Sequence, residues 1–513
     1  MTRTLFEGGR VRTVAAPATA DWVLVDDATI VAAGSRDDVP AADRRVDLDG
    51  GTLTPAFCDA HVHLPATGLY AGGMDFRAER SAGRIVEAFA QRARAGAGLL
   101  FGGNFEDPLD RPLEACDLDD AVGDRAALLA RADMHSCVVS SALLRGLELD
   151  GLEGVDRDGA GRPTGYLRER AAGEAWSWFD RSLPPHDQRA AIRRAVDLAY
   201  SKGVGSVHEM HVVEWRGWPS LEVTRSVVDE AALHVVLYVA TAEVGKVVDM
   251  GLPRIGGDLF LDGSFGSHTA WLTEPYGSRP PAGSPAQGIS YRRDDELLEI
   301  FLEAQREGLQ VGVHAIGDAA IEQALRVWEA VAAKAGPEAV RARGHRIEHF
   351  ECSSDDHMRR ARHLGLRASV QPAFDRFWGG GDGMYAARIG GRRAADMNRF
   401  GTMLRSGLEL GAGSDSTVTP LDPFLQMASL RAHHVRAESL DAHEALRAHT
   451  SGAHALAGFD DVRGGITPGY EADLALLDRD PVETDAEGLL DTEVIGTWIG
   501  GARVWPEEEA EAR

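Results

Sequence analysis

The stretch Thr54-Pro-Ala-Phe-Cys-Asp-Ala-His-Val-His-Leu64 is a short apolar run that ends in two histidines. Side chains alternate between the faces of a strand, so His61 and His63 leave the same face while Val62 points the other way. Two neutral imidazoles at one strand end make half of a metal site. A strand terminus with two ordinary polar residues is the alternative, and one His-x-His motif does not decide between them.

The composition limits the classes of protein and partner that need to be considered. A chain of 513 residues is too long for one simple core and predicts two or three structural units. Its 44% hydrophobic and 26% charged residues are typical of a soluble globular protein. The formal net charge of -26 argues against nucleic acid or an anionic membrane as a partner. An acidic surface does not by itself define a substrate; we expect a small-molecule substrate, and we leave a homodimer open.

The cellular location follows from the N-terminus and the cysteines. The first residues carry an early Glu7 and lack the long apolar core of a secretory signal. No apolar run is long enough to span a bilayer. The four cysteines contain no Cys-x-x-Cys pair, which fits a reducing compartment without a disulfide framework. These features predict a cytoplasmic protein.

The two ends of the chain resemble each other in pattern. Residues 1–53 and 465–513 contain short alternating runs separated by Gly and Asp turn signals, which indicate strands. Neither piece has enough strands to close a core alone. We therefore predict that the termini combine into one small β-sandwich.

The middle of the chain alternates strand-like and helical patterns. Besides the strand that ends at His63, strands are predicted at residues 204–207, 234–239, 258–261, 309–314, 346–350, 367–371 and 410–415. Eight strands that alternate with helices predict an α/β fold of the (β/α)₈ or TIM-barrel type, built from residues 54–64 and 182–464. Residues 65–181 do not fit this repeat. They follow the first strand, so we predict an insert domain that covers the active site at the C-terminal face.

Metal-type ligands stand at four of the predicted strand ends. His61 and His63 end the first strand, His314 the fifth, His349 the sixth and Asp415 the eighth. In a barrel these ends converge on one mouth. Four imidazoles and a carboxylate suit Zn, Mn, Ni or Fe better than Mg or Ca. Taken singly, the histidines could be hydrogen-bonded core residues, and the aspartate could cap a helix.

The sequence resembles the amidohydrolase superfamily, and more closely its amidohydrolase family 3 branch, which includes N-substituted formamide deformylase-like enzymes. The resemblance spans nearly the whole chain. It is carried by the stretches Pro55-Ala-Phe-Cys-Asp-Ala-His-Val-His, Leu261-Asp-Gly-Ser-Phe-Gly-Ser-His-Thr-Ala, His314-Ala-Ile-Gly-Asp-Ala-Ala, His345-Arg-Ile-Glu-His-Phe, Gly413-Ser-Asp, Gly465-Ile-Thr-Pro-Gly-Tyr-Glu-Ala-Asp-Leu and Thr497-Trp-Ile-Gly-Gly-Ala-Arg-Val.

The resemblance implies a ligand set and one departure from it. The metal ligands and acid/base group would be His61, His63, His314, His349 and Asp415. Many relatives carry a carboxylated lysine on strand four that bridges two metals, but the aligned residue here is Asp258. The chain has only three lysines, Lys202, Lys246 and Lys334, and none lies on that strand. We expect one or two divalent transition-metal ions, with zinc first, and no carboxylated lysine; Asp258 either bridges two ions or is a polar residue that caps the strand.

The expected reaction is hydrolysis of a non-peptide carbon–nitrogen bond, such as that of an amide or an N-formyl or N-acyl amine. A bound metal lowers the pKa of water to about 7. Asp415 would accept the water proton and deliver it to the leaving nitrogen, and His349 or His314 would add a metal contact or polarise the carbonyl. A deaminase, a cyclic-amide hydrolase, a metal-dependent isomerase or lyase and a catalytically silent ligand-binding barrel are the alternatives.

Substrate contacts are expected from loops and from the insert. His135 lies in the insert, His268 and Trp271 lie in the loop 266–276, and Phe374 and Trp378 lie in the loop 372–382. The aromatic side chains suggest an apolar or aromatic part of the substrate. Packing of these loops on the barrel is the alternative.

Overall fold

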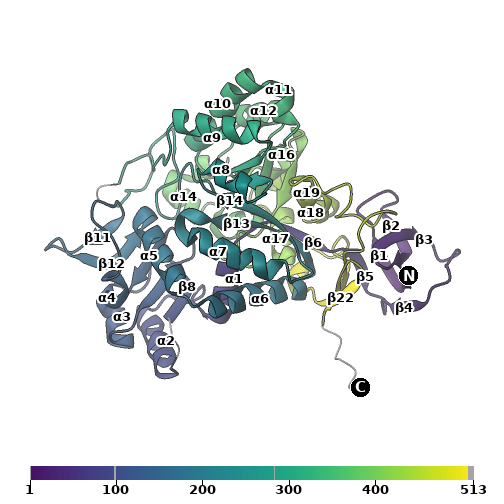
Figure 1. Ribbon diagram of the computed structural model, residues 1–513, viewed down its shortest axis with the longest axis horizontal. Coiled ribbons are helices and arrows are strands. Elements are labelled where there is room, and N and C mark those ends of the chain that lie inside the picture. The colour runs from purple at the N-terminus through teal and green to yellow at the C-terminus, as the bar shows by residue number, and fades with distance from the viewer. Residues whose placement is uncertain (1, 97–99, 282–283, 507–513) are drawn as a thin grey trace.

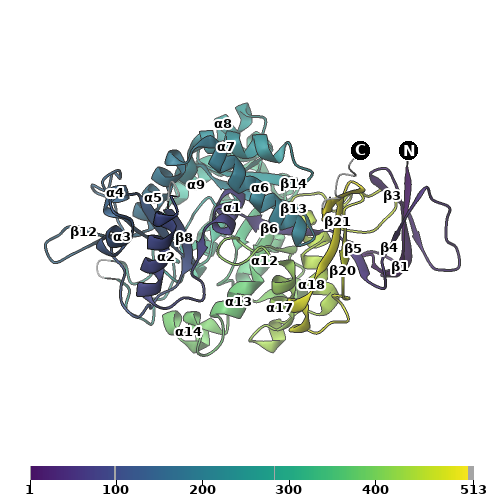
Figure 2. The same cartoon turned by 90° about the horizontal axis from the view of Figure 1, so that it is seen from below.

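Both ends of the chain contribute to one eight-stranded sheet in the computed structural model, which describes residues 2–96, 100–281 and 284–506. Its order is β22-β21-β20-β5-β1-β2-β3, and β4 pairs with β1. The strands are β1 (Arg3–Arg12), β2 (Thr19–Asp26), β3 (Thr29–Gly34), β4 (Arg44–Asp47), β5 (Thr52–Pro55), β20 (Leu474–Leu477), β21 (Val494–Ile499) and β22 (Ala502–Trp505). The termini meet where β5 pairs antiparallel with β20, and Phe6 packs edge-on against Trp498 at 5.2 Å. The two terminal segments therefore share one sheet, and β3 and β21 lie toward the same side of the molecule (Figure 2).

Eight parallel strands form the middle of the molecule in two ladders. The first contains β6 (Phe57–Val62), β13 (Val204–Val212) and β14 (His234–Ala240). The second contains β15 (Arg254–Ile255), β16 (Gln310–Ala315), β17 (Arg346–His349), β18 (Arg367–Val370) and β19 (Leu410–Ala412). The ladders touch at both ends, because Gly256 N donates to Val239 O at 2.7 Å and Val62 forms a parallel bridge with Ser416.

The fourth parallel strand lies earlier in the sequence than predicted. The expected strand at 258–261 is wrong, because β15 covers only Arg254–Ile255. Gly256 and Gly257 follow with φ of 83° and 75°, a left-handed conformation that a regular strand cannot continue. Phe260 then returns to the sheet through one isolated bridge with His314. The interruption leaves Asp258 in an irregular segment between the two pairings.

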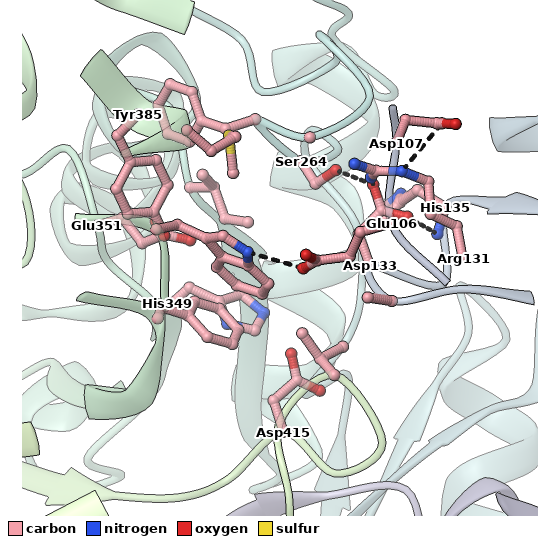
Figure 3. A pocket seen from close by; sticks show the side chains of 18 of the residues that line it. Glu106, Asp107, Arg131, Asp133, His135, Ser264, His349, Glu351, Tyr385 and Asp415 are labelled. Atoms are coloured by element: carbon pink, nitrogen blue, oxygen red, sulfur yellow. Dashed lines mark hydrogen bonds and ion pairs between the residues drawn. The ribbon is translucent and has the colours of Figure 1, made fainter. Parts of the chain in front are cut away.

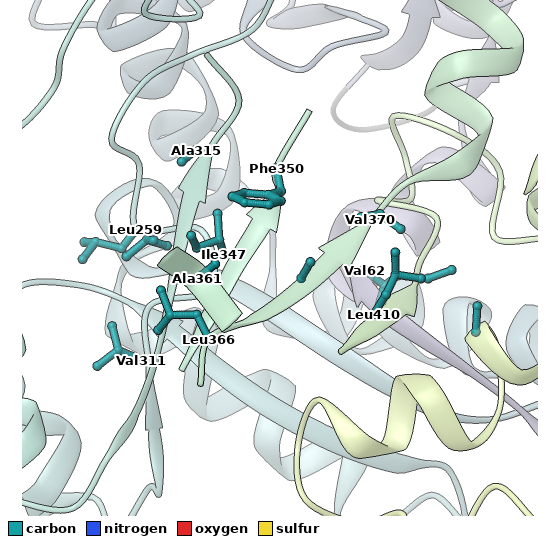
Figure 4. Packing of buried hydrophobic residues seen from close by; sticks show 14 of the residues in the cluster. Val62, Leu259, Val311, Ala315, Ile347, Phe350, Ala361, Leu366, Val370 and Leu410 are labelled. Carbon is teal, nitrogen blue, oxygen red and sulfur yellow. The ribbon is translucent and has the colours of Figure 1, made fainter. Parts of the chain in front are cut away.

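Buried aliphatic side chains fill the space between the parallel strands and the helices outside them (Figure 4). Val62, Val311, Ile347, Val370 and Leu410 each come from a different strand and are at most 4% exposed. The helices around the strands are α6 (Pro185–Ser201), α7 (Val213–Val228), α8 (Val244–Asp249), α9 (Asp294–Arg306), α10 (Asp318–Ala335), α11 (Pro337–Arg341), α12 (Asp355–Leu364), α16 (Phe400–Arg405), α17 (Pro423–Arg431), α18 (Ala442–Ala448) and α19 (Ser451–Ala455).

Helix α10 shows why these segments are helical. Ile321, Ala324, Leu325 and Trp328 recur at helical spacing and are all fully buried, so the helix has one apolar face. Its C-terminus is set by Gly336, whose φ is 93°. Burial of this face, rather than helix propensity alone, holds the helix on the sheet.

The region between β6 and β13 has its own sheet, ordered β11-β12-β10-β9-β8-β7. Its strands are β7 (Met74–Asp75), β8 (Leu100–Phe105), β9 (Ala127–Arg131), β10 (Ser136–Val139), β11 (Val155–Arg157) and β12 (Pro163–Arg168), and its helices are α1 (Leu64–Gly72), α2 (Ala82–Arg94), α3 (Ala115–Val122), α4 (Ser141–Leu144) and α5 (Glu169–Ser182). This blue region lies at the opposite end of the molecule from the sheet of the termini (Figure 1). Within the described residues, no helix combines the length and the apolar character that crossing a bilayer requires.

Candidate metal centre and active site

The carboxyl ends of the parallel strands bring four of the predicted ligands to one point. His61 and His63 end β6, and their Nε2 atoms lie 3.4 Å and 3.1 Å from Asp258 Oδ2. The same atoms lie 3.5 Å and 3.2 Å from Asp415 Oδ1, beyond the end of β19. Residues 354 positions apart in the sequence therefore face one another because neighbouring parallel strands end on the same side.

His314 and His349 complete the group from β16 and β17. His314 Nδ1 and His349 Nε2 each lie 3.7 Å from Asp258 Oδ1. The ring of His349 is 4.9 Å from that of His61 and 4.5 Å from that of His314, measured between centroids. Asp258 thus stands at the centre of the cluster, with contacts to all four histidines.

The donors in this cluster fit a divalent transition metal. His61 Nε2, Asp258 Oδ1 and Asp415 Oδ1 are buried without a hydrogen-bond partner, which is rare for interior polar atoms. Ligand atoms about 2.05 Å from a tetrahedral zinc ion lie about 3.3 Å apart, which is close to the separations here. Three groups, His61–His349–Asp415, His61–His63–Asp258 and Asp258–His314–His349, each place three ligand atoms within 4.8 Å of one another. Because Asp258 and His61 belong to more than one group, the donor set suits one ion or two.

Partners outside the cluster hold the imidazole rings. His63 Nδ1 lies 2.9 Å from Met210 O, and His349 Nδ1 lies 2.7 Å from Gln371 Oε1. These contacts hold each ring so that its Nε2 atom points toward the cluster. Hydrogen bonds from groups behind the ligands orient metal-binding histidines in the same way. The rings are therefore positioned before any ligand binds.

The ring of His61 is held by a buried ion pair. His61 Nδ1 lies 3.0 Å from Glu348 Oε2, and Arg346 Nη2 donates to the same oxygen at 2.7 Å. All three side chains are completely buried. Burial raises the pKa of Glu348, but Arg346 outweighs it and lowers that pKa to about 2.

Mutual attraction sets the protonation of the cluster. Burial lowers the pKa of His63, but the carboxylates of Asp258 and Asp415, 3.1 Å and 3.2 Å from its Nε2, raise it to about 9. Burial raises the pKa of Asp258, but the charge of His61 and the close approach of the other histidines hold that pKa well below its usual value. Burial and the neighbouring His349 lower the pKa of His314 to about 4. At pH 7 the carboxylates are therefore ionised and His314 is neutral, whereas His63 carries a proton that a bound metal ion would have to displace.

The backbone at two of these strand ends is unusual. His349 has φ 69°, Phe350 has φ 52° and Asp415 has φ 50°, although none is a glycine. Such conformations cost about 1–3 kcal/mol each and cluster at functional sites. Here they turn His349 and Asp415 toward the cluster at the point where the strands end.

The lysines of the chain lie away from the cluster. Lys202 Nζ pairs with Asp422 at 2.6 Å, Lys246 lies 4.0 Å from the ring centroid of Trp218, and Lys334 belongs to α10. Asp258 occupies the position that faces the histidines. Its short carboxylate reaches both sides of the cluster, with Oδ2 toward His61 and His63 and Oδ1 toward His314 and His349.

A cavity with about 660 Å³ of empty volume opens above the cluster. His314 lines it. His349 and Asp415 lie on one side of this cavity, and Arg131 and Asp133, from the region between β6 and β13, lie on another, with Nη1 and Oδ2 2.5 Å apart (Figure 3). The cavity wall therefore combines the parallel strands with the segment between β6 and β13. We call it the metal-side cavity.

The predicted substrate contacts divide into two groups. His135, Phe374 and Trp378 line the metal-side cavity. His268 and Trp271 lie outside its lining, contrary to expectation. His268 Nε2 is instead 2.9 Å from Ser278 Oγ, and Trp271 packs against the main hydrophobic core. Both belong to a loop that folds back along the strands, so its aromatic side chains serve packing.

Several residues of the site were not found from the sequence. Glu351 lines the cavity and is buried, and burial raises its pKa to about 7. Glu169 Oε2 lies 3.0 Å from His135 Nδ1 and holds that ring. The only signal for Glu348 was its spacing from Arg346 in His345-Arg-Ile-Glu-His. Residues two positions apart in a strand point to the same face, so these opposite charges lie next to each other. Glu169 and Glu351 gave no comparable signal.

Comparison with known proteins identifies the family. The family model described as "Amidohydrolase family" matches residues 44–505. The chain belongs to this family. It is 28% identical over 503 residues to YtcJ of Bacillus subtilis (strain 168), a protein named as an amidohydrolase, with 90% of each chain covered. It is 25% identical over 549 residues to an N-substituted formamide deformylase of Arthrobacter pascens, with 96% of each covered.

A solved structure supports the same conclusion. An uncharacterized metal-dependent hydrolase from Pyrococcus furiosus shares 28% identity at a TM-score of 0.74, and the match covers 94% of this chain and 100% of that one. Family membership and this neighbour support a metal-dependent hydrolase with a mixed α/β fold.

Proposed function

We propose that this protein hydrolyses a non-peptide carbon–nitrogen bond, such as that of an amide or an N-formyl or N-acyl amine, with Asp415 as the general acid and base. The observation that carries the proposal is the group of unpartnered donors of His61, Asp258 and Asp415, which lies beneath a cavity lined by aromatic and polar side chains. The N-substituted formamide deformylase among the relatives supports a substrate of this kind.

The metal in this proposal is a divalent transition metal, with zinc first, held as one or two ions by His61, His63, Asp258, His314, His349 and Asp415. When bound, such an ion lowers the pKa of water to about 7 and polarises a carbonyl oxygen. Asp415 is the one carboxylate of the cluster that also lines the cavity. It can therefore take a proton from the attacking water and return it to the leaving nitrogen.

We also infer a more specific architecture. The contacts between the two parallel ladders support one eight-stranded barrel of residues 54–64 and 182–464. Residues 1–53 and 465–513 would be a composite sandwich, and residues 65–181 an insert that covers the site. The net charge of -26 argues against nucleic acid or an anionic membrane as a partner, and the four cysteines without a Cys-x-x-Cys pair support a cytoplasmic location.

The first test measures metal content and then hydrolysis. Protein purified in chelator-free buffer is analysed for bound elements and offered N-formyl amines, N-acyl amines, cyclic amides and amino-purines. We expect bound metal and release of an amine from an acyclic amide, with one heavy oxygen incorporated from labelled water. Ammonia release from amino-purines would replace the proposal with a deaminase, and a product without heavy oxygen would replace it with an isomerase or lyase. Protein that holds no metal and turns over nothing would be a silent binding protein.

A further inference from the structure

A second cavity adjoins the metal-side cavity, and nothing in the proposed reaction uses it. It has about 700 Å³ of empty volume and lies between the start of α5, the start of α7 and the segment that precedes α9. His135 lines both cavities, and Phe260 in the second wall packs 4.8 Å from the ring of His314. We call it the α5 cavity. The two cavities therefore lie on either side of His135, beside the metal centre.

The metal-side cavity is apolar and acidic. Phe265, Phe374, Trp378 and Tyr385 supply aromatic surface. Four carboxylates besides Asp415 face it, and Arg131 is the one guanidinium in its lining. Aromatic faces and an excess of carboxylates attract an apolar group that carries or gains a positive charge.

The α5 cavity has a different wall. Trp215 and Phe260 stack at 4.9 Å with an interplanar angle of 18°, which leaves a flat aromatic surface. Arg292 is occupied, because it pairs with Glu214 and Glu296. Arg170 is exposed, and among the residues that the structure describes it has no ion-pair or hydrogen-bond partner. This cavity therefore offers a free guanidinium for an anionic or polar group.

His135 stands at the junction in a fixed orientation. Its Nδ1 lies 3.0 Å from Glu169 Oε2, and Glu169 also accepts hydrogen bonds from Tyr291 and Thr269. Three donors hold the carboxylate, so the ring cannot turn without breaking this network. The Nε2 atom of His135 remains available between the two cavities.

The chemistry of hydrolysis indicates which half of a substrate lies in which cavity. Water adds its oxygen to the carbonyl carbon, the carbon–nitrogen bond breaks, and the nitrogen takes the proton, so the products are an ammonium and a carboxylate. Asp415, which would protonate the leaving nitrogen, lines the metal-side cavity and not the α5 cavity. The amine half must therefore lie on the metal side.

We propose that the substrate spans both cavities, with an apolar, ring-bearing amine half in the metal-side cavity and a polar acyl half in the α5 cavity near Arg170 and Trp215. This assignment rests on the proposed amide hydrolysis. It adds a specificity site that the cluster of metal ligands does not require.

The experiment uses four amides made from two acids and two amines: the acetyl and succinyl amides of methylamine and benzylamine. The holoenzyme is compared with Trp378→Ala in the metal-side cavity and Arg170→Ala in the α5 cavity, and Trp215→Ala is the second variant there. We expect Trp378→Ala to lower kcat/KM about tenfold for the benzylamides and less than threefold for the methylamides, whichever acid is present. Arg170→Ala should lower kcat/KM about threefold to fivefold for the succinyl amides only.

If no amide is hydrolysed, the binding of benzylamine and of succinate, which stand for the amine half and the acyl half, tests the inference. Calorimetry with benzylamine and with succinate is done on the wild type and on both variants. The inference holds if Trp378→Ala weakens only benzylamine and Arg170→Ala weakens only succinate, even when the proposed hydrolysis has failed. It is overturned if both variants affect the same half, if benzylamine and succinate compete for one site, or if Arg170→Ala and Trp215→Ala leave every succinyl measurement unchanged.

Discussion

The substitution Glu348→Gln tests whether the buried ion pair beside the metal centre stabilises the protein. Both Glu348 oxygens accept from Arg346, at 2.9 Å from Nε and 2.7 Å from Nη2. The substitution leaves a buried guanidinium without a counter-charge. A pKa that falls from 4.5 to about 2 corresponds to about 3 kcal/mol at about 1.36 kcal/mol per pKa unit. Removal of one partner of a buried pair typically costs about 3–5 kcal/mol. We therefore expect Glu348→Gln to lower the free energy of unfolding by about 3 kcal/mol.

Urea unfolding at pH 7 measures the effect, with Glu409→Gln as the matched control. Glu409 pairs with Arg367 at 2.7 Å, but its side chain is 44% exposed, so the control should lose less than about 1 kcal/mol. Metal affinity gives an independent readout. His61 Nδ1 loses its carboxylate partner in Glu348→Gln, and loss of such a partner typically weakens metal binding by about 10–100-fold.

The contribution of Glu348 to the free energy of unfolding depends on pH. The pKa of Glu348 is depressed in the folded state, so its stabilisation is complete above about pH 4.5 and is lost as the pH falls toward about 2. The wild type should lose about 3 kcal/mol in this range that Glu348→Gln does not lose. Equal stability of the wild type and Glu348→Gln at pH 7, or parallel acid profiles, would refute the reasoning.

Three further predictions concern the cluster and the strand before it. Asp415→Asn should retain metal by elemental analysis but lose about 10²–10⁴-fold in kcat, because it removes the proton acceptor; near-wild-type turnover would contradict this role. His63→Ala should purify with less metal than the wild type in chelator-free buffer, and unchanged content would remove His63 from the ligand set. Gly256→Ala should lower the free energy of unfolding by more than about 1 kcal/mol, because φ is 83° and the new Cβ would collide with the carbonyl oxygen of Gly312. Gly391→Ala, with open space around it, should change stability by less than about 0.5 kcal/mol, and equal effects of the two would contradict the steric argument.

The parts of the site that the sequence predicted depend on local periodicity. Alternation along β6 placed His61 and His63 on one face, and both rings do face Asp258. His345 has the same strand parity as His349, but it precedes β17 and therefore lies at the end of the strand away from the cluster. In the structure His345 Nδ1 accepts from Val311 N, and its ring stacks on Trp328 away from the cluster. Periodicity works here because each of these strands is regular and buried.

The remaining parts depend on contacts between distant segments. The fourth strand was misplaced because two consecutive glycines break it, and periodicity does not show where the chain returns to the sheet. The role of Glu169 requires His135, Thr269 and Tyr291 to converge from three separate segments. Single-sequence patterns carry no information on such convergence. The same limit explains why His268 and Trp271 were placed in the cavity.

The sheet of the termini has a consequence for biosynthesis. Strand β5 lies between β1 and β20, and its partner β20 is made more than 400 residues later than β5. Until the ribosome has released that segment, the hydrogen-bonding edge of β5 is open to other chains. Fast elongation would shorten this exposure, and a chaperone that shields β5 would protect the edge while it lasts. A nonsense mutation between residues 416 and 473 would leave this edge of β5 unpaired even though every metal ligand had already been translated.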